Sequence, residues 1–229
     1  MNRRQFLQWI AGAVALGGWQ TTAKFDTDAR IAGVTGALQR RPQEGKTKVV
    51  VARHPRLYKL PDDKPPHTLG MRTLYETIFE LLEAGMLELT NARSWADAWR
   101  KFVKPTDVVG IKVNCIAGAS LSSNPMLVNA IVAGLRSAGV PYSRIIVWDR
   151  STRELSRAGF KVRMRPPGVL CYGTDAVGYR KQLSSFGEVA TRVSNIVAEQ
   201  CTVLINVPVL KTHYLSGLTA ALKNHYGSI

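Results

Sequence analysis

The chain has 229 residues, 45% of them hydrophobic, so it can bury a sizeable core and is not a disordered protein. Its 31 Lys and Arg against 16 Asp and Glu give a formal net charge of +15, which points to nucleic acid, an anionic membrane surface or acidic small molecules as partners. A P-loop, a Rossmann glycine fingerprint, paired carboxylates and a Ser-His-Asp order are all missing, which excludes enzymes that depend on these signatures.

The N-terminus resembles a twin-arginine export signal. Arg3 and Arg4 are followed, after one residue, by Phe6 and Leu7 and then by an apolar stretch over residues 9–19. This stretch is too short to span a bilayer, which takes about 20 residues. We therefore predict export by the twin-arginine route to the periplasm or another extracytoplasmic space, with the signal either cleaved or kept as a membrane anchor.

Three regions are expected along the chain. Residues 1–23 form the signal segment, residues 24–47 form a linker of mixed composition, and residues 48–229 form a single α/β domain. The twin-arginine route carries folded proteins and often serves those that receive a cofactor before export. The resemblance to such signals therefore implies a cofactor without naming one.

The domain is expected to begin at Lys48. The apolar run over residues 49–52 predicts a strand covered on both faces. Leucine and isoleucine at three-to-four-residue spacing predict an amphipathic helix over residues 72–89. Ser94 is then placed to cap a second, short helix that reaches residue 102.

A parallel crossover is expected next. Residues 107–114 have the pattern of a buried strand, and residues 144–149 have the pattern of its successor. Between them, Asn124 and Pro125 supply the N-cap and first turn of a helix that reaches Gly139. Strand, helix and strand in so few residues imply a right-handed parallel crossover.

Two more strands, at residues 169–172 and 202–207, extend the predicted sheet, and a final helix is expected at residues 216–225. The predicted fold is a three-layer α/β domain with a mostly parallel sheet and helices on both faces. The final helix leaves one edge of the sheet without a strand to close it. An early strand, a partner or a longer chain would have to cover that edge.

Polar side chains gather where the predicted strands end. Lys112 and Asn114 close one strand, Asp149 closes its neighbour, and Asn206 and Lys211 follow the apolar core of another. Ligands of open α/β sheets bind outside the carboxyl ends of the strands, so we expect these side chains to meet there. Lysine suits phosphate or carboxylate and asparagine orients a polar ligand, which predicts a small anionic substrate or cofactor. The alternative is a set of solvated strand-end residues.

Four neighbouring residues complete the predicted binding site: Thr212, Thr219, Lys223 and Asn224. Thr219 and Lys223 are four positions apart and would share one face of the final helix. The first amides of that helix, near Ser216, would favour an anion by themselves. The alternative here is an ordinary Ser/Gly cap and an exposed lysine.

His213 is the candidate catalytic residue. Its imidazole could act as a general acid or base, as a metal ligand, or as a loop histidine bonded to the backbone. A metal site would recruit Asp149 and His225, although these have no recognised ligand spacing. The cysteines are scattered without CxxC spacing, so they predict buried strand thiols rather than a zinc or iron–sulfur site: Cys115, Cys171 and Cys201.

The same residues carry a family resemblance. Over residues 48–227 the chain resembles the domain-of-unknown-function 362 family, through two strand ends and one longer block. The matching segments are 109–114, 146–149 and 205–213, followed by Leu218-Thr219, Lys223-Asn224 and Gly227. Val113 stands where the family commonly has proline, and family members tend to continue beyond the Lys-Asn motif.

Some members of that family are joined to ferredoxin-like segments with iron–sulfur clusters, so the resemblance implies redox chemistry in those members. This chain has no cysteine-rich segment. Two functions therefore stay open. One is an exported protein that binds a small anionic substrate or cofactor, linked to a redox process. The other is a non-catalytic binding or redox-accessory protein that depends on an iron–sulfur redox partner.

A basic stretch follows the second predicted strand of the crossover and contains Arg150, Arg153, Arg157, Lys161, Arg163 and Arg165. If exposed, it would attract phosphate backbones. Neither a nucleic-acid-binding motif nor interleaved aromatic residues accompany it, and an exported protein seldom meets a genome. We therefore predict a solvated basic face that contacts anionic lipid headgroups at a membrane surface rather than nucleic acid.

Overall fold

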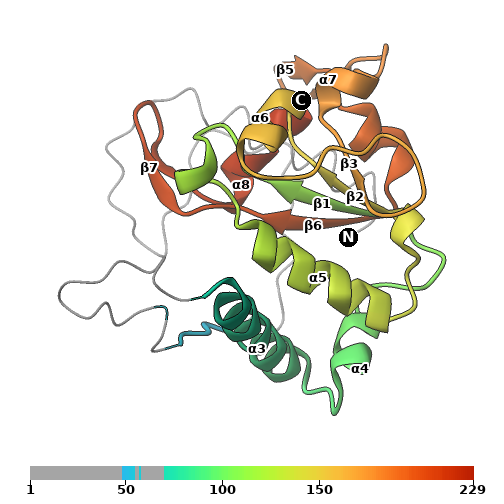
Figure 1. Cartoon of the computed structure of the whole chain (residues 1–229). Coiled ribbons are helices and arrows are strands. Elements are labelled where there is room, and N and C mark those ends of the chain that lie inside the picture. The colour runs from blue at the N-terminus through green and yellow to red at the C-terminus, as the bar shows by residue number, and fades with distance from the viewer. Residues whose placement is uncertain (1–47, 55–56, 58–69) are drawn as a thin grey trace.

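The computed structural model describes residues 48–54, 57 and 70–229. The predicted signal segment 1–23 and linker 24–47 lie outside the described residues. In the described part, helices pack around a central parallel sheet (Figure 1).

The described elements run from α3 to a short C-terminal 3-10 helix. The α-helices are α3 Met71–Thr90, α4 Trp95–Arg100, α5 Pro125–Ser137, α6 Thr152–Arg157, α7 Thr174–Val177 and α8 Ala221–Asn224. The strands are β1 Val109–Val113, β2 Ile145–Trp148, β3 Leu170–Cys171, β4 Ser184–Phe186, β5 Val189–Thr191, β6 Val203–Val207, β7 Lys211–His213 and β8 Gly217–Thr219. The remaining helical segments are the 3-10 helices η2 Ala119–Leu121, η3 Tyr142–Arg144 and η5 His225–Ser228, and the π-helix η4 Ile196–Gln200.

The central sheet has four parallel strands in the order β3-β2-β1-β6. Near the end of β1, Lys112 pairs with Trp148 of β2 on one side and with Asn206 of β6 on the other. The prediction of a three-layer α/β fold with a mostly parallel sheet is confirmed, and so is the parallel pairing of the two crossover strands. The carboxyl ends of β1, β2 and β6 therefore meet at one edge.

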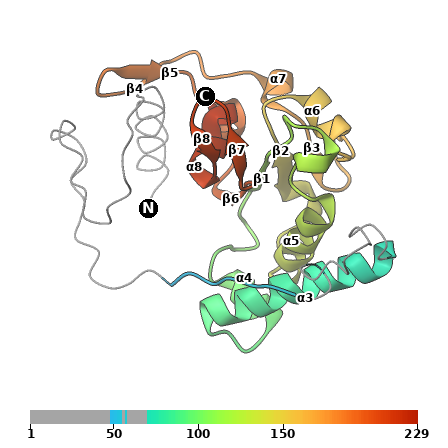
Figure 2. The same cartoon turned by 90° about the vertical axis from the view of Figure 1, so that its left-hand side faces the viewer.

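Two apolar clusters cover the two faces of the sheet. On one face Ile111 packs in a cluster with Trp99 of α4 and Leu135 of α5, and α3 lies beyond α5 (Figures 1 and 2). On the other face Trp148 packs in a cluster with Ile196 of η4. Successive side chains of a strand point to opposite faces, so Ile145 and Val147 of β2 belong to the first cluster and Ile146 and Trp148 to the second.

Local sequence signals set the helices that cover the first face. The Ser94 side chain accepts a hydrogen bond from the Asp97 amide at 3.2 Å, and Asn124 Oδ1 accepts one from the Met126 amide at 2.8 Å. Both side chains act as N-caps, as the sequence predicts. Gly134 lets α4 approach α5 closely, because a Cβ there would lie 2.1 Å from the indole nitrogen of Trp99.

The predicted strand at residues 49–52 is wrong. This segment forms no strand, and Val49 and Val51 are 79% and 72% exposed. Val50 and Ala52 instead line an apolar cavity with α3 and α5. A short apolar run can be buried against a helix as well as within a sheet, and four residues are too few to decide between the two.

Strand β6 forms one outer edge of the sheet, which the sequence predicts to be covered by an early strand, a partner or a longer chain. Within residues 48–54 and 70–229, β6 pairs only with β1, so no early strand from that part of the chain covers it. Across the same ranges, no helix has both the length and the apolar character needed to cross a bilayer.

Candidate functional site

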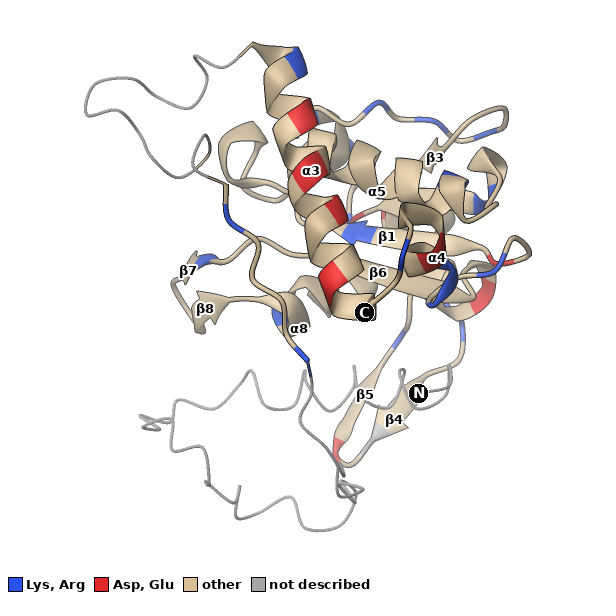
Figure 3. Ribbon diagram, turned by 90° about the horizontal axis from the view of Figure 1, so that it is seen from below, with Lys and Arg blue, Asp and Glu red and all other residues tan. Residues whose placement is uncertain are grey.

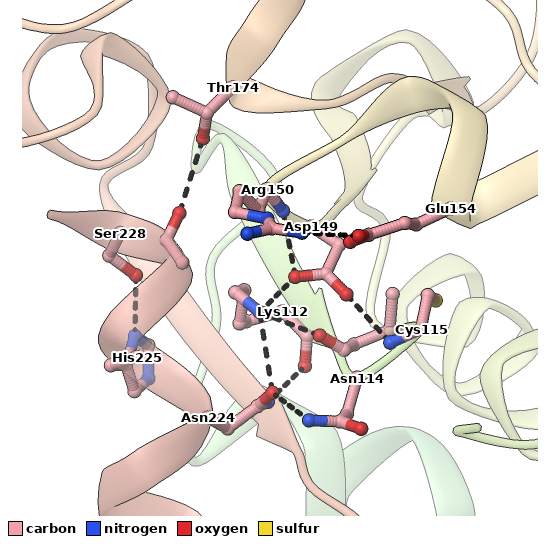
Figure 4. A network of polar contacts seen from close by, with 12 residues as sticks. Lys112, Asn114, Cys115, Asp149, Arg150, Glu154, Thr174, Asn224, His225 and Ser228 are labelled. Carbon is pink, nitrogen blue, oxygen red and sulfur yellow. Dashed lines mark hydrogen bonds and ion pairs between the residues drawn. The ribbon is translucent and has the colours of Figure 1, made fainter. Parts of the chain in front are cut away.

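A buried ion pair lies at the carboxyl edge of the sheet, between β1 and β2. The Lys112 Nζ atom is 2.6 Å from Asp149 Oδ1, and Lys112 is only 1% exposed (Figure 4). Lys112 Nζ also donates to the Val113 carbonyl oxygen at 2.7 Å. Burial lowers the pKa of Lys112, although the Asp149 carboxylate opposes that shift. The anion that Lys112 contacts in this structure is therefore the protein's own carboxylate.

Asp149 is held by the backbone as well as by Lys112. Its Oδ2 accepts a hydrogen bond from the Cys115 amide at 2.7 Å, and its Oδ1 accepts one from the Arg150 amide at 2.7 Å. A carboxylate with an ammonium and two amide donors is well satisfied. The chain just after β1 is thereby tied to the chain just after β2.

Three asparagines extend this network towards β6 and α8. Asn224 Oδ1 accepts from Lys112 Nζ and from Asn114 Nδ2, both at 3.3 Å. Its Nδ2 donates to Asn206 Oδ1 at 2.8 Å, and Asn206 Nδ2 donates to the Ala221 carbonyl oxygen at 2.7 Å. Side chains from β6, α8 and the loop after β1 are therefore brought together at one edge, as the sequence predicts for these positions.

Two further lysines approach the same edge. Lys211 Nζ donates to Asn114 Oδ1 at 2.7 Å and to the Leu121 carbonyl oxygen at 3.1 Å. Burial lowers the pKa of Lys223, and the positive charge of Lys211 lowers it further. In the described part of the chain, neither lysine forms an ion pair with a carboxylate. Positive charge therefore exceeds negative charge at the edge where the asparagines meet.

The segment after Lys211 corrects the prediction of one long final helix. Residues 211–219 form an antiparallel hairpin of β7 and β8, and helix begins only at Ala221. Thr219 and Lys223 therefore do not share a helical face, and there is no helix N-terminus at Ser216 to bind an anion. Gly217 has φ of 69°, which suits a turn and not the first turn of a helix.

Of the remaining predicted site residues, three lie on this hairpin. His213 Nδ1 accepts hydrogen bonds from the Leu215 and Ser216 amides, both at 3.2 Å, which is the geometry of a loop histidine bonded to the backbone. Thr212 is exposed. Thr219 is buried, and its hydroxyl has no hydrogen-bond partner among the described residues. Within the described part of the chain, no hydrogen bond joins these three residues to the asparagine network.

Sequence reasoning missed several residues that shape the edge. Ser123 Oγ donates to the Val207 carbonyl oxygen at 2.5 Å and accepts from the Asn114 amide at 2.8 Å, which ties β6 to the loop after β1. A Cβ on Gly227 would lie 3.2 Å from Asp149 Oδ1, so η5 packs directly over the ion pair. Gly227 could be found from the sequence, because it belongs to the family resemblance. Ser123 could not, because its role depends on a hydrogen bond to Val207, 84 positions further along the chain.

The metal and thiol alternatives find little geometric support in the described part of the chain. No group of three or more His, Cys, Asp and Glu residues there could hold a metal ion. All three cysteines are buried, as predicted, and none forms a disulfide. Only Cys171 lies in a strand, whereas Cys115 follows β1 and Cys201 follows η4, so the prediction of strand thiols is wrong for these two. Burial raises the pKa of Cys171 to about 11 and raises that of Cys115 still further, so both are neutral thiols at neutral pH in this structure.

The basic stretch is only partly free of internal partners. Arg150 forms an ion pair with Glu154, and Arg163 donates to the Pro167 carbonyl oxygen at 2.9 Å. Arg153 and Arg157 belong to α6, and Lys161 is exposed. The contact of this basic stretch with lipid headgroups stays a prediction.

The apolar cavity lined by α3, by α5 and by Val50, Ala52 and Leu57 is separate from this edge. Its volume is about 780 Å³, and it contains none of the predicted site residues. Its lining is almost wholly aliphatic, with Asn124 as the polar exception. The polar convergence at the carboxyl edge, and not this cavity, is the candidate site.

Comparison with known proteins gives one match. The family model described as Domain of unknown function (DUF362) matches residues 109–229, which includes every predicted site residue from Lys112 to Asn224. No curated protein and no solved structure matches the chain.

Proposed function

The chain belongs to the family described as Domain of unknown function (DUF362), and from that premise we propose that it binds a small anionic substrate or cofactor at the carboxyl edge of its parallel sheet. One observation carries the proposal. Lys112, Lys211 and Lys223 converge there, and among the described residues only Lys112 is paired with a carboxylate, that of Asp149. Two ammonium groups without a carboxylate partner in the described chain would attract an anion.

The residues divide into an internal layer and a binding layer. Lys112 and Asp149 are buried and form the internal layer, which fixes Asn224 and the loop after β1. Lys211 and Lys223 are partly exposed and supply the charge for the ligand. Asn114, positioned by Lys211 and Asn224, would orient the ligand's polar groups because an amide both donates and accepts.

The proposal assigns no proton transfer to His213. Its Nδ1 already accepts hydrogen bonds from two amides of its own turn, so this nitrogen is occupied as an acceptor. Binding and orientation are the functions that the contacts support. The class of ligand is a phosphate or carboxylate, because an ammonium group is a compact point charge that suits either.

Substituting the two partly exposed lysines tests the site. We expect Lys211→Ala and Lys223→Ala each to weaken the binding of inorganic phosphate about tenfold, because each removes a charge-assisted contact. Titration followed by phosphorus NMR measures weak binding directly. Native mass spectrometry of the purified protein then shows whether a retained anion disappears from both variants.

Lys181→Ala is the matched control for this experiment. Lys181 is an exposed lysine, so its substitution removes the same charge from the whole protein but none from the sheet edge. It should leave phosphate binding unchanged. Equal phosphate binding by the wild type and both edge variants would refute the site.

A partner-dependent role is the second candidate function. Cys115, Cys171 and Cys201 lack CxxC spacing and form no group that could hold a metal ion in the described part of the chain, so in a redox process the clusters would belong to another protein. This chain would then act as the binding or accessory subunit. Co-purification of an iron-containing protein with the exported chain supports that role, and its absence under native conditions counts against it.

Export by the twin-arginine route completes the proposal. Arg3 and Arg4 support it by their position ahead of Phe6-Leu7 and a short apolar stretch. We expect the double substitution Arg3→Lys with Arg4→Lys to hold the protein in the cytoplasm, as measured by cell fractionation and immunoblotting. The control is Lys24→Arg, an exchange between the same two residue types at the first position after the predicted signal segment. It should leave export intact. Normal export of the double variant would exclude this route.

A further inference from the structure

The tip of the β7–β8 hairpin exposes two large side chains. Tyr214 is 98% exposed and Leu215 is 81% exposed, and both lie in the turn between the strands. Figure 1 shows the hairpin standing out beside α8, and Figures 1 and 2 both show it away from the helices that cover the first face of the sheet. Single exposed apolar residues are ordinary, but an adjacent aromatic and aliphatic pair at a projecting tip indicates a contact surface.

Side chains within the hairpin hold its tip in shape. His213 Nδ1 accepts hydrogen bonds from the amides of Leu215 and Ser216, both at 3.2 Å. Ser216 Oγ donates to the Leu218 carbonyl oxygen at 3.1 Å. These backbone groups are therefore satisfied by side chains of the hairpin itself. Moving such a tip from water into a less polar region costs less free energy than moving a turn whose amides would lose their hydrogen bonds to water.

The charge around the hairpin has one sign. From Gln200 to Ile229 the sequence contains no Asp or Glu, while Lys211 and Lys223 flank the hairpin. The acidic residues of α3 lie along the outer side of that helix, away from β7 and β8 (Figure 3). A surface that meets this hairpin should therefore be anionic.

We propose that the hairpin tip inserts Tyr214 and Leu215 into the interfacial region of an anionic lipid membrane. Tyrosine and leucine beside lysines are the side chains that bind this region, since the apolar groups enter it and the ammonium groups contact the phosphates. The area of the tip argues against a protein partner. A stable protein interface buries about 800 Å² on each partner, which the turn of a two-stranded hairpin cannot supply.

This inference goes beyond the proposed anion site and can fail independently of it. Tip variants should leave phosphate binding unchanged, because the side chains of Tyr214 and Leu215 are exposed and, among the described residues, neither residue forms a hydrogen bond with the asparagine network. Lys211→Ala should weaken both the binding of phosphate and the binding of vesicles. Its effect on vesicles should be about fivefold, which is the contribution of one basic residue near an anionic surface.

A fluorophore at the tip tests insertion directly in the full chain. The native cysteines are all buried, so an environment-sensitive fluorophore will label the Tyr214→Cys variant selectively. Its emission should shift to the blue with vesicles of phosphatidylcholine and phosphatidylglycerol, and should not shift with phosphatidylcholine alone. Leu183→Cys, at a position that is 64% exposed and lies next to β4, is the matched control and should not respond.

Binding measurements complete the test. The double variant Tyr214→Ser, Leu215→Ser should lower the partition of the protein into phosphatidylglycerol vesicles about tenfold. Leu183→Ser should leave it unchanged. The proposal is overturned if the fluorophore at position 214 gives no blue shift with anionic vesicles. It is also overturned if the shift appears without vesicles as protein concentration rises, since the tip would then contact a second copy of the chain.

Discussion

Substituting Lys112 with methionine should lower the free energy of unfolding by about 3–5 kcal/mol, which is the usual cost of leaving one member of a buried ion pair without its partner. Methionine has nearly the same length as lysine and avoids a large cavity. Asp149 would remain buried with only the Cys115 and Arg150 amides as donors. Urea unfolding followed by circular dichroism measures the change.

A double-mutant cycle separates the ion pair from simple packing. Asp149→Asn should also destabilise the protein, but the combination with Lys112→Met should cost less than the sum of the two single effects. Arg72→Met is the matched control, because Arg72 forms an exposed ion pair with Glu76. That variant should unfold at the wild-type urea concentration. Unchanged stability of Lys112→Met would show that the buried pair does not hold this edge together.

Acid should destabilise the protein through His225. This side chain is buried and its Nδ1 lies 3.0 Å from Ser228 Oγ. Burial lowers its pKa to about 4, and the charge of Lys112 contributes to the same shift. An unfolded histidine has a pKa of about 6.5, so between these two values the unfolded chain binds one proton more than the folded chain. Stability is therefore full above about pH 6.5 and falls as the pH is lowered towards 4.

The shift corresponds to a loss of about 3 kcal/mol between pH 6.5 and 4. Urea unfolding of the wild type and of His225→Asn at a series of pH values measures it as a difference. Asparagine does not titrate, so the gap in stability between the two proteins should narrow as the pH falls. Other acid-sensitive groups, such as Asp175 with its lowered pKa, are present in both proteins, so their contributions cancel in the difference in stability. A gap that stays constant with pH would contradict a buried neutral His225.

The regular elements were predictable because their signals are local. Ser94 and Asn124 cap helices whose side-chain pattern repeats every turn, and the strands at 107–114 and 144–149 have mostly apolar centres that end in polar residues. The run at 49–52 carried the same signal but packs beside α3, because nothing local says which surface will bury it. The hairpin 211–219 was missed because its turn relies on His213 Nδ1 accepting hydrogen bonds from the amides of Leu215 and Ser216, further along the chain.

The sequence by itself determined the fold class, the strand ends, and many of the polar residues at the carboxyl edge, such as Lys112, Asp149 and Asn206. Parallel strands place their carboxyl ends together, so residues that close separate strands must meet. The tertiary structure alone decided which of those residues are buried and which are exposed to solvent. Lys112 and Asp149 are buried against each other, whereas Lys211 and Lys223 remain open to solvent. That division depends on η5 packing over the ion pair, a contact between segments far apart in the chain that no local pattern encodes.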